Sequence, residues 1–287
     1  MLQLQLRDGA QLAYRDAGSG PALLLLHGWS MRKEAFAAQF QALDARFRVV
    51  APDLRGHGAS SKAVSGTDLK ALADDVTELV LALDLTDIVV VGWSMGAIVA
   101  WTMLKGEAAA RIRGIVVVDM VPRILSDPDW PYGLREGTDS SSYDPYIARM
   151  RQDWPAFTSE YIPGNVARGR EQQRSALLAR LYELVEHNDP ESMAVLWRAL
   201  AEVDLRNFVA QLDLPTLISY GERGQLYSSD AFAWLHDHIT NSRRVSFADS
   251  GHAPHMEEPD KFNDVLAEFA DRLNSEAATA MVNGTDI

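Results

Sequence analysis

The stretch Ile88-Val89-Val90-Val91-Gly92-Trp93-Ser94-Met95-Gly96-Ala97 joins two kinds of local structure. Its first four residues are apolar and β-branched, which is typical of a strand that is buried on both faces. Residues 97–104 have helical character, and a glycine lies two positions before and two positions after Ser94. Side chains at those positions would clash with the neighbouring strand and helix. The pattern therefore predicts a strand, a sharp turn with strained backbone angles at Ser94, and a helix.

Other apolar runs of strand length lie on both sides of this stretch. They occupy residues 22–26, 47–51, 115–118, 216–220 and 244–247. Apolar residues at helical spacing separate several of these runs, as between 69 and 83, and a further amphipathic helix is expected after Pro259. This alternation predicts an α/β fold with a mostly parallel, doubly wound sheet. The first residues alternate apolar and polar side chains around Asp8-Gly9, which predicts an antiparallel hairpin at one edge.

The alternation is interrupted between 121 and 208. This segment begins rich in Pro, Asp and Ser and continues with leucines at helical spacing. We expect it to form an inserted helical cap on a core made of residues 1–120 and 209–274. Some of its aromatic side chains are expected to line a substrate pocket, and most are expected to form the core of the cap. Residues 275–287 are small and polar and are expected to form a flexible tail.

Composition excludes several classes of function. The formal net charge of −13 disfavours nucleic acid as a partner, because a phosphate backbone is bound by a basic surface. No run of eighteen apolar residues indicates a membrane span, and no cysteine is available for a disulfide, a thiolate metal site or cysteine catalysis. The N-terminus lacks the pattern of a secretory signal, so a cytoplasmic location is expected.

Two histidines follow predicted strands at the edge of the sheet where Ser94 is expected. His252, in Asp249-Ser250-Gly251-His252, follows the last strand and is the better general base for a serine nucleophile. His27 ends an earlier strand and is expected to stabilise its loop. The backbone N–H groups of Trp29 and Met95 are placed to hold a developing oxyanion. His255 with Glu257 or Glu258 is an alternative metal site that we disfavour, because no third histidine lies nearby.

The sequence resembles the α/β-hydrolase superfamily over almost its whole length, most closely its serine carboxylesterase-like members. The resemblance is carried by His27-Gly28-Trp29, by residues 52–60 (PDLRGHGAS), by Gly92-Trp93-Ser94-Met95-Gly96, and by Ser250-Gly251-His252 with Glu258-Pro259. It implies a cap over the active site, an oxyanion hole at Trp29 and Met95, and a catalytic triad that includes Ser94 and His252.

The third member of that triad departs from the pattern of most relatives. They carry the acid in a segment like Gly-x-x-Asp, whereas this sequence reads Gly221-Glu222-Arg223-Gly224. Asp119, which ends the strand after the nucleophile, is the favoured acid, because a carboxylate that closes an apolar strand needs a partner for its charge. Glu222 is the alternative acid.

These residues predict a serine hydrolase that cleaves a small or medium-sized carboxylic ester through an acyl-enzyme intermediate. Dehalogenase and epoxide-hydrolase activities are disfavoured, because those relatives use Asp as the nucleophile. No cofactor and no metal are expected, and a small-molecule ester is the expected partner. Two alternatives remain: a cofactor-free haloperoxidase or perhydrolase, and a weakly hydrolytic ligand receptor. The sequence does not predict the oligomeric state.

Overall fold

The computed structural model describes residues 2–135, 143–170 and 172–283, with side chains as far as residue 276 except that of residue 143. One eight-stranded sheet forms its centre, with the strand order β1-β2-β4-β3-β5-β6-β7-β8. The strands are β1 (Leu2–Gln5), β2 (Gln11–Ala17), β3 (Ala22–Leu26), β4 (Arg48–Pro52), β5 (Ile88–Trp93), β6 (Ile112–Val118), β7 (Thr216–Gly221) and β8 (Ser242–Phe247).

Only the first two strand pairs of this sheet are antiparallel. β1 pairs with β2 and β2 with β4 in antiparallel register, and all later neighbours are parallel. Every side chain of β3 and of β5 is buried, as expected for strands covered on both faces. The predicted mostly parallel sheet and its N-terminal hairpin are therefore confirmed.

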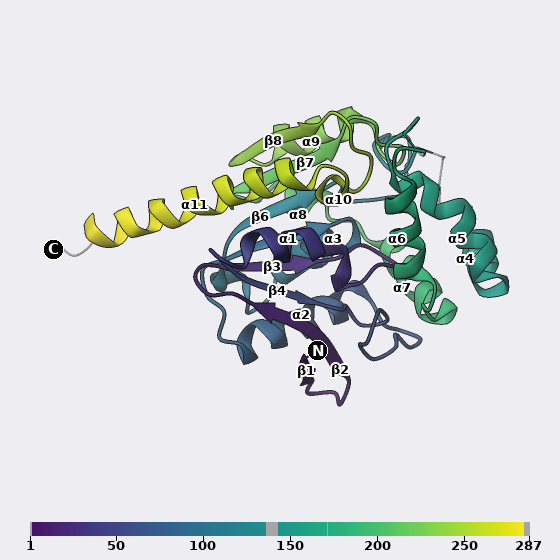
Figure 1. Ribbon diagram of the computed structural model, residues 1–287, viewed down its shortest axis with the longest axis horizontal. Coiled ribbons are helices and arrows are strands. Elements are labelled where there is room, and N and C mark those ends of the chain that lie inside the picture. The colour runs from purple at the N-terminus through teal and green to yellow at the C-terminus, as the bar shows by residue number, and fades with distance from the viewer. Residues whose placement is uncertain (1, 136–142, 171, 284–287) are drawn as a thin grey trace.

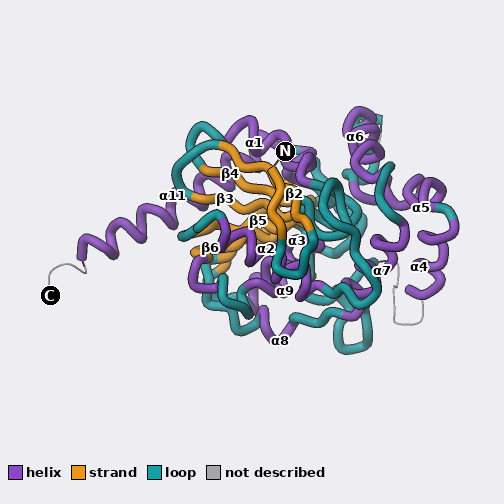
Figure 2. The backbone as a smooth tube through the Cα atoms, turned by 90° about the horizontal axis from the view of Figure 1, so that it is seen from below, coloured by secondary structure: helices purple, strands orange, loops and turns teal. Residues whose placement is uncertain are grey.

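Helices cover both faces of the sheet and are gathered at one of its ends. The α-helices are α1 (Ala37–Leu43), α2 (Leu69–Ala82), α3 (Met95–Met103), α4 (Tyr143–Gln152), α5 (Trp154–Tyr161), α6 (Ser175–Val185), α7 (Pro190–Glu202), α8 (Arg206–Val209), α9 (Ser229–His238), α10 (Pro254–Glu257) and α11 (Pro259–Asn283). The 3₁₀ helices are η1 (Lys33–Phe36), η2 (Ala109–Arg111) and η3 (Ile162–Asn165). Figure 2 shows α1 and α11 on one face of the sheet and α2, α3, α8 and α9 on the other.

Aspartate residues cap several of these helices. Asp68, Asp153 and Asp189 each accept a hydrogen bond from a backbone N–H in the first turn of α2, α5 and α7, respectively. Such a cap satisfies one of the N–H groups that lack an acceptor within the helix, which stabilises the helix by about 1 kcal/mol. The caps fix where the crossover helix and two helices of the inserted segment begin.

The inserted segment leaves the sheet after β6 and returns to it at β7. Figures 1 and 2 show α4 to α7 together at one end of the sheet, beyond the end of β6. The leucine spacing that predicted helices here is confirmed by α6 and α7. The assignment of 121–208 as a separate cap on a core of 1–120 and 209–274 stays a prediction.

The C-terminal helix is longer than expected. A flexible tail was predicted from residue 275, but α11 continues to Asn283, and its last turns project from the end of the molecule opposite α4 to α7 (Figure 1). Residues 284–287 lie outside the described part of the chain. None of the helices within that part is long and apolar enough to cross a lipid bilayer.

Candidate active site

Ser94 lies in a strained turn between β5 and α3. Its φ of 54° and ψ of −124° place it in a region that residues with side chains rarely adopt, at a cost of about 1–3 kcal/mol. A Cβ atom on Gly92 would lie 2.5 Å from Cα of Ala97, and one on Gly96 would lie 2.1 Å from the carbonyl oxygen of Leu26. The predicted strand, sharp turn and helix are confirmed, together with the reason for the two glycines.

His252 and Asp119 are joined by a hydrogen bond between buried side chains. Nδ1 of His252 lies 2.8 Å from Oδ1 of Asp119, and each side chain is 2% exposed. Because a carboxylate accepts this bond, Nδ1 carries a hydrogen, and in the neutral form of the ring Nε2 then keeps a lone pair. That arrangement suits a base whose Nε2 takes a proton from a nucleophile.

The backbone fixes Asp119 between β6 and β7. Its N–H donates to the carbonyl oxygen of Ser219, at 2.8 Å, and its Oδ2 accepts from the N–H of Gly221, at 3.2 Å. Its φ of 48° turns the chain sharply at the end of β6. Asp119 is therefore held by the strand next to its own, with one carboxylate oxygen left for His252.

Glu222 does not reach His252. Its Oε1 accepts a hydrogen bond from the hydroxyl of Ser246, at 2.6 Å, and the residue is exposed at the edge of the sheet. Arg223 pairs with Asp249 and not with Glu222. Of the two candidate acids, the structure brings only Asp119 to the histidine. Gly224, at the position where most relatives carry the acid, lies near the same carboxylate: a Cβ atom on it would be 3.9 Å from Oδ2 of Asp119, and 3.2 Å from the carbonyl oxygen of Gly221.

The loops that carry Ser94 and His252 meet behind the site. The indole N–H of Trp93 donates to the backbone carbonyl of His252, at 2.7 Å. Ser94 is partly exposed, and no hydrogen bond joins its hydroxyl to His252 within the described residues. Catalytic hydrogen bonds are often long without substrate and shorten in the reacting complex, so this spacing is compatible with a serine–histidine pair.

The loop after β3 presents a free backbone N–H next to the serine. Neither Trp29 N–H nor Met95 N–H donates a hydrogen bond within the described part of the chain. A Cβ atom on Gly28 would lie 3.1 Å from Cβ of Ser94, which shows how closely the loop approaches the serine. The two N–H groups, from the loop after β3 and from the N-terminus of α3, are thus available to an oxyanion.

Two buried histidines hold this loop in place. Nε2 of His27 accepts from the N–H of Leu54 at 2.9 Å, and Nε2 of His57 accepts from the N–H of Ser30 at 3.1 Å. Burial lowers the pKa of His27 to about 4 and that of His57 to about 3, so both are neutral near pH 7. The interpretation of His27 as a loop-stabilising residue is confirmed, and His57 supports the same loop from the turn after β4.

A buried ion pair that the sequence did not predict joins the segment after β3 to the turn after β4. Nζ of Lys33 lies 2.7 Å from Oδ2 of Asp53, and the backbone N–H groups of Lys33 and Ala59 also donate to this carboxylate. A buried ion pair is tolerated when hydrogen bonds satisfy its remaining atoms, as they do here. In the sequence Asp53 was noted only as part of residues 52–60, which carry the family resemblance, because its partner Lys33 lies on a different element.

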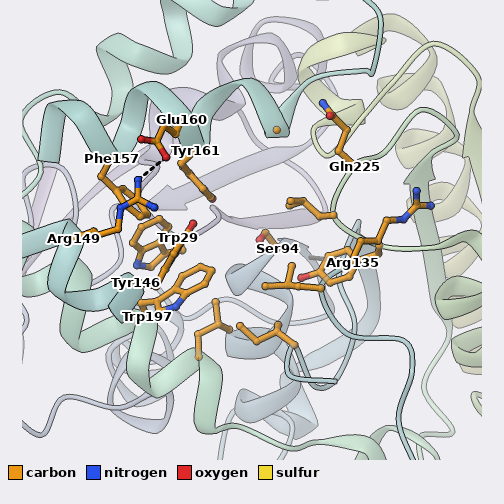
Figure 3. A pocket seen from close by; sticks show the side chains of 16 residues that line it. Trp29, Ser94, Arg135, Tyr146, Arg149, Phe157, Glu160, Tyr161, Trp197 and Gln225 are labelled. Carbon is orange, nitrogen blue, oxygen red and sulfur yellow. Dashed lines mark hydrogen bonds and ion pairs between the residues drawn. The ribbon is translucent and has the colours of Figure 1, made fainter. Parts of the chain in front are cut away.

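A cavity of about 500 Å³ opens above Ser94 (Figure 3). One wall is aromatic and consists of Trp29, Tyr146, Phe157, Tyr161 and Trp197, mostly from α4, α5 and α7. The lining also includes the aliphatic side chains of Ile124, Leu134, Leu200 and Leu226. Among the tryptophans of the inserted segment, Trp197 lines the cavity, whereas Trp130 and Trp154 do not and are buried. Charged or polar side chains also line the cavity, namely those of Arg135, Arg149, Glu160 and Gln225, so its aromatic and aliphatic parts suit an uncharged organic group and other parts can contact polar atoms.

The arginines of the inserted segment are largely engaged in ion pairs. Arg149 pairs with Glu160 beside the aromatic wall, as Figure 3 shows. Arg151 pairs with Glu191, and Arg170 pairs with Asp249. In each of these pairs, the carboxylate neutralises the charge of one arginine.

Comparison with known proteins identifies the family of this chain. A model of the alpha/beta hydrolase family matches residues 23–265. The chain belongs to the α/β-hydrolase family. It is a hydrolase with esterases and non-heme chloroperoxidases among its relatives.

Three relatives of this α/β-hydrolase illustrate that range. A pimeloyl-[acyl-carrier protein] methyl ester esterase of Nitrosomonas europaea is 29% identical over 256 residues, covering 88% of this chain and 97% of the relative. The non-heme chloroperoxidase CPO-A1 of Kitasatospora aureofaciens is 28% identical over 276 residues, covering 93% and 98%. The structure of an esterase from Exiguobacterium antarcticum has a TM-score of 0.86 at 25% identity, covering 94% of this chain and 98% of the other.

The side chains of the alternative metal site in this hydrolase have other surroundings. His255 is packed among the rings of Phe36, Trp93 and Phe262, and neither of its ring nitrogens has a hydrogen-bond partner in the described chain. The carboxylates of Glu257 and Glu258 accept hydrogen bonds from the loop before His252. Among the described residues, no group of three or more His, Asp or Glu side chains is arranged to hold a metal ion.

Proposed function

We propose that this hydrolase cleaves small or medium-sized carboxylic esters, with Ser94, His252 and Asp119 as its catalytic triad. The observation that carries the proposal is the buried Asp119–His252 hydrogen bond of 2.8 Å beside a serine on a strained turn. A structural histidine would be expected to use both ring nitrogens, as His27 does. Here one nitrogen is held by a carboxylate and the other has no partner in the described chain, which favours a role as a base.

The proposed reaction has two halves. Ser94 Oγ bonds to the ester carbonyl carbon while its proton moves to Nε2 of His252, and the N–H groups of Trp29 and Met95 stabilise the oxyanion. The C–O bond to the alcohol then breaks, and the alcohol leaves with the proton from His252. A water molecule, deprotonated by His252, attacks the acyl-enzyme and releases the carboxylic acid and the free serine.

A labelling experiment and a substrate panel test this proposal together. A fluorophosphonate probe is expected to label the wild type and not Ser94→Ala. A panel of esters that differ in acyl-chain length, methyl esters included, is expected to show turnover that the Ser94→Ala control lacks. Absence of labelling in folded wild-type protein would contradict an activated serine. The cavity of about 500 Å³ leads us to expect an upper limit to the acyl chain.

A second candidate is a cofactor-free perhydrolase, which the similarity to a non-heme chloroperoxidase favours. In that reaction hydrogen peroxide, in place of water, attacks the same acyl-enzyme, and the peroxy acid released oxidises a halide. Peroxide-dependent halogenation far faster than ester hydrolysis would favour this activity. A cytoplasmic location and a small-molecule ester as the partner stay part of the proposal.

A further inference from the structure

The loop that carries His252 is in backbone contact with the inserted segment. The N–H of His252 donates to the carbonyl oxygen of Asn165, at 3.2 Å. Gly251 approaches the same segment so closely that a Cβ atom on it would lie 2.5 Å from the carbonyl carbon of Val166. Residues 165–167, which comprise the last residue of η3 and the two that follow it, therefore pack directly against the loop that carries His252.

A single carboxylate links the two segments. Oε1 of Glu257 accepts from the N–H of Gly251 at 2.7 Å, and Oε2 accepts from the N–H of Ala167 at 2.8 Å. The Glu257 side chain is 0% exposed, so these bonds are shielded from water. Each carboxylate oxygen of Glu257 therefore accepts a hydrogen bond from a different segment, and these two segments are far apart in the sequence.

A guanidinium from the inserted segment reinforces this link. Nε of Arg174 lies 3.6 Å from Oε2 of Glu257, and its Nη1 donates to the backbone carbonyl of the same residue at 2.5 Å. Its Nη2 donates to the carbonyl of Asp249, at 3.1 Å. Arg174 therefore contacts the chain on both sides of the histidine.

We propose that Glu257 is a positioning residue. It hydrogen bonds both to the loop that carries His252 (residues 249–252, the histidine loop) and to residues 165–167, and thereby keeps the His252 imidazole aligned with Asp119. The proposal rests on the function proposed above for the same site. It means that the inserted segment contributes to turnover even when the ester is too small to contact the aromatic wall. Glu257 acts through the backbone of the loop and does not touch the reacting atoms.

The substitution Glu257→Gln tests the bridge, because a carboxamide has only one acceptor oxygen. Its NH₂ group would face a backbone N–H, so one of the two hydrogen bonds is lost although the volume is conserved. For p-nitrophenyl acetate we expect kcat to fall roughly 10- to 100-fold, because a histidine displaced by about 1 Å costs that much. KM is expected to change by less than about threefold, since no contact with the substrate is lost.

Asp189→Asn is the matched control. Asp189 also fastens the inserted segment to the rest of the molecule, through Lys62 Nζ at 2.7 Å, and it accepts from the N–H of Ser192 at 3.0 Å. None of its hydrogen bonds involves the histidine loop. Because Asp189 is more exposed than Glu257 and asparagine is also a good N-cap, we expect Asp189→Asn to lose less thermal stability than Glu257→Gln and to keep a kcat within about twofold of the wild type. Equal losses of kcat would point to general loosening and overturn the proposal.

A readout that needs no substrate separates this proposal from the proposed function. The Nδ1 proton shared by His252 and Asp119 should give a far-downfield proton NMR signal, assigned by its absence in Asp119→Asn. We expect Glu257→Gln to weaken or abolish the signal and Asp189→Asn to retain it. An unchanged signal in both variants would overturn the positioning role, whether or not the wild type hydrolyses esters. Inactive wild-type protein with the expected NMR result would contradict only the proposed function.

Arg174→Gln carries the same test if Glu257→Gln fails to fold. Arg174 is partly exposed, so its replacement is expected to be tolerated, and it removes the bonds to the carbonyls of Asp249 and Glu257. We expect the same pattern at a smaller scale, with kcat about fivefold lower, an unchanged KM and a weakened NMR signal. A wild-type kcat with a wild-type signal would contradict the proposal.

Discussion

Asp119 and His252 are 133 residues apart in the chain, and their side chains meet at 2.8 Å with almost no exposure to water. This pairing predicts that Asp119→Asn lowers the turnover of p-nitrophenyl butyrate by about 10³- to 10⁴-fold, because an amide favours the wrong histidine tautomer. Glu222→Gln is the control. Since Glu222 contacts Ser246 at the edge of the sheet, its loss is expected to change turnover by less than about twofold. The opposite ranking would make Glu222 the triad acid.

The space beside Gly224 predicts a second-site rescue. A Cβ atom there would lie 3.9 Å from Oδ2 of Asp119 and 3.2 Å from the carbonyl oxygen of Gly221, so after a small shift of this backbone we expect a carboxylate at position 224 to replace Asp119 as the partner of His252. Combining Gly224→Asp with Asp119→Asn is expected to restore turnover by about tenfold or more over Asp119→Asn alone, since one acid again orients the histidine. Steady-state kinetics on the four combinations would measure this. A double variant no faster than Asp119→Asn would show that the loop cannot deliver the carboxylate.

Replacing His255 by Phe is expected to stabilise the folded protein, and to do so more at low pH than at high pH. Its ring nitrogens are buried without partners, and burial lowers its pKa to about 3. The unfolded chain binds a proton at this residue below about pH 6.5, whereas the folded protein does not, so the histidine destabilises the fold increasingly as the pH falls from 6.5 towards 3. His255→Phe is expected to flatten this decline, by about 2 kcal/mol at pH 5 relative to pH 8. Urea unfolding at both pH values would check it, and parallel pH curves for the two proteins would contradict it.

The proposed mechanism predicts that chelators have no effect. Ester hydrolysis is expected to continue unchanged after incubation with EDTA, because each step uses only protein groups and water. The measurement is the initial rate before and after dialysis against the chelator. A loss of activity that zinc restores would revive the metal site at His255, Glu257 and Glu258.

Local patterns in the sequence were sufficient to predict most of the fold. The predicted runs became β3 to β8, of which all but the edge strand β8 are largely buried, because short stretches rich in β-branched and other apolar residues between turn residues favour strands. The turn at Ser94 was predictable from local sequence as well, since both glycines, Gly92 and Gly96, lie within two residues of the serine. The C-terminal helix was underestimated, because small residues after Ser275 were interpreted as a tail although alanine favours helix.

Contacts between distant segments were not predictable in the same way. Spacing could place Asp119 and Glu222 at the same edge of the sheet, but the direction of each side chain depends on how β7 and β8 pack beside them. The bridge made by Glu257 and the buried pair of Lys33 and Asp53 have no local signature. Each depends on two loops that meet only after the whole sheet has formed.

The order of strands along the chain has a consequence for protein synthesis. Ser94 and Asp119 follow the adjacent strands β5 and β6, whereas His252 follows β8, which is the last of the described strands to be synthesised. A chain that stops before this point therefore presents the serine turn without the imidazole that we propose as its general base. Such a fragment is expected to be inert towards esters, so on the proposed mechanism activity cannot appear before the segment after β8 has been made.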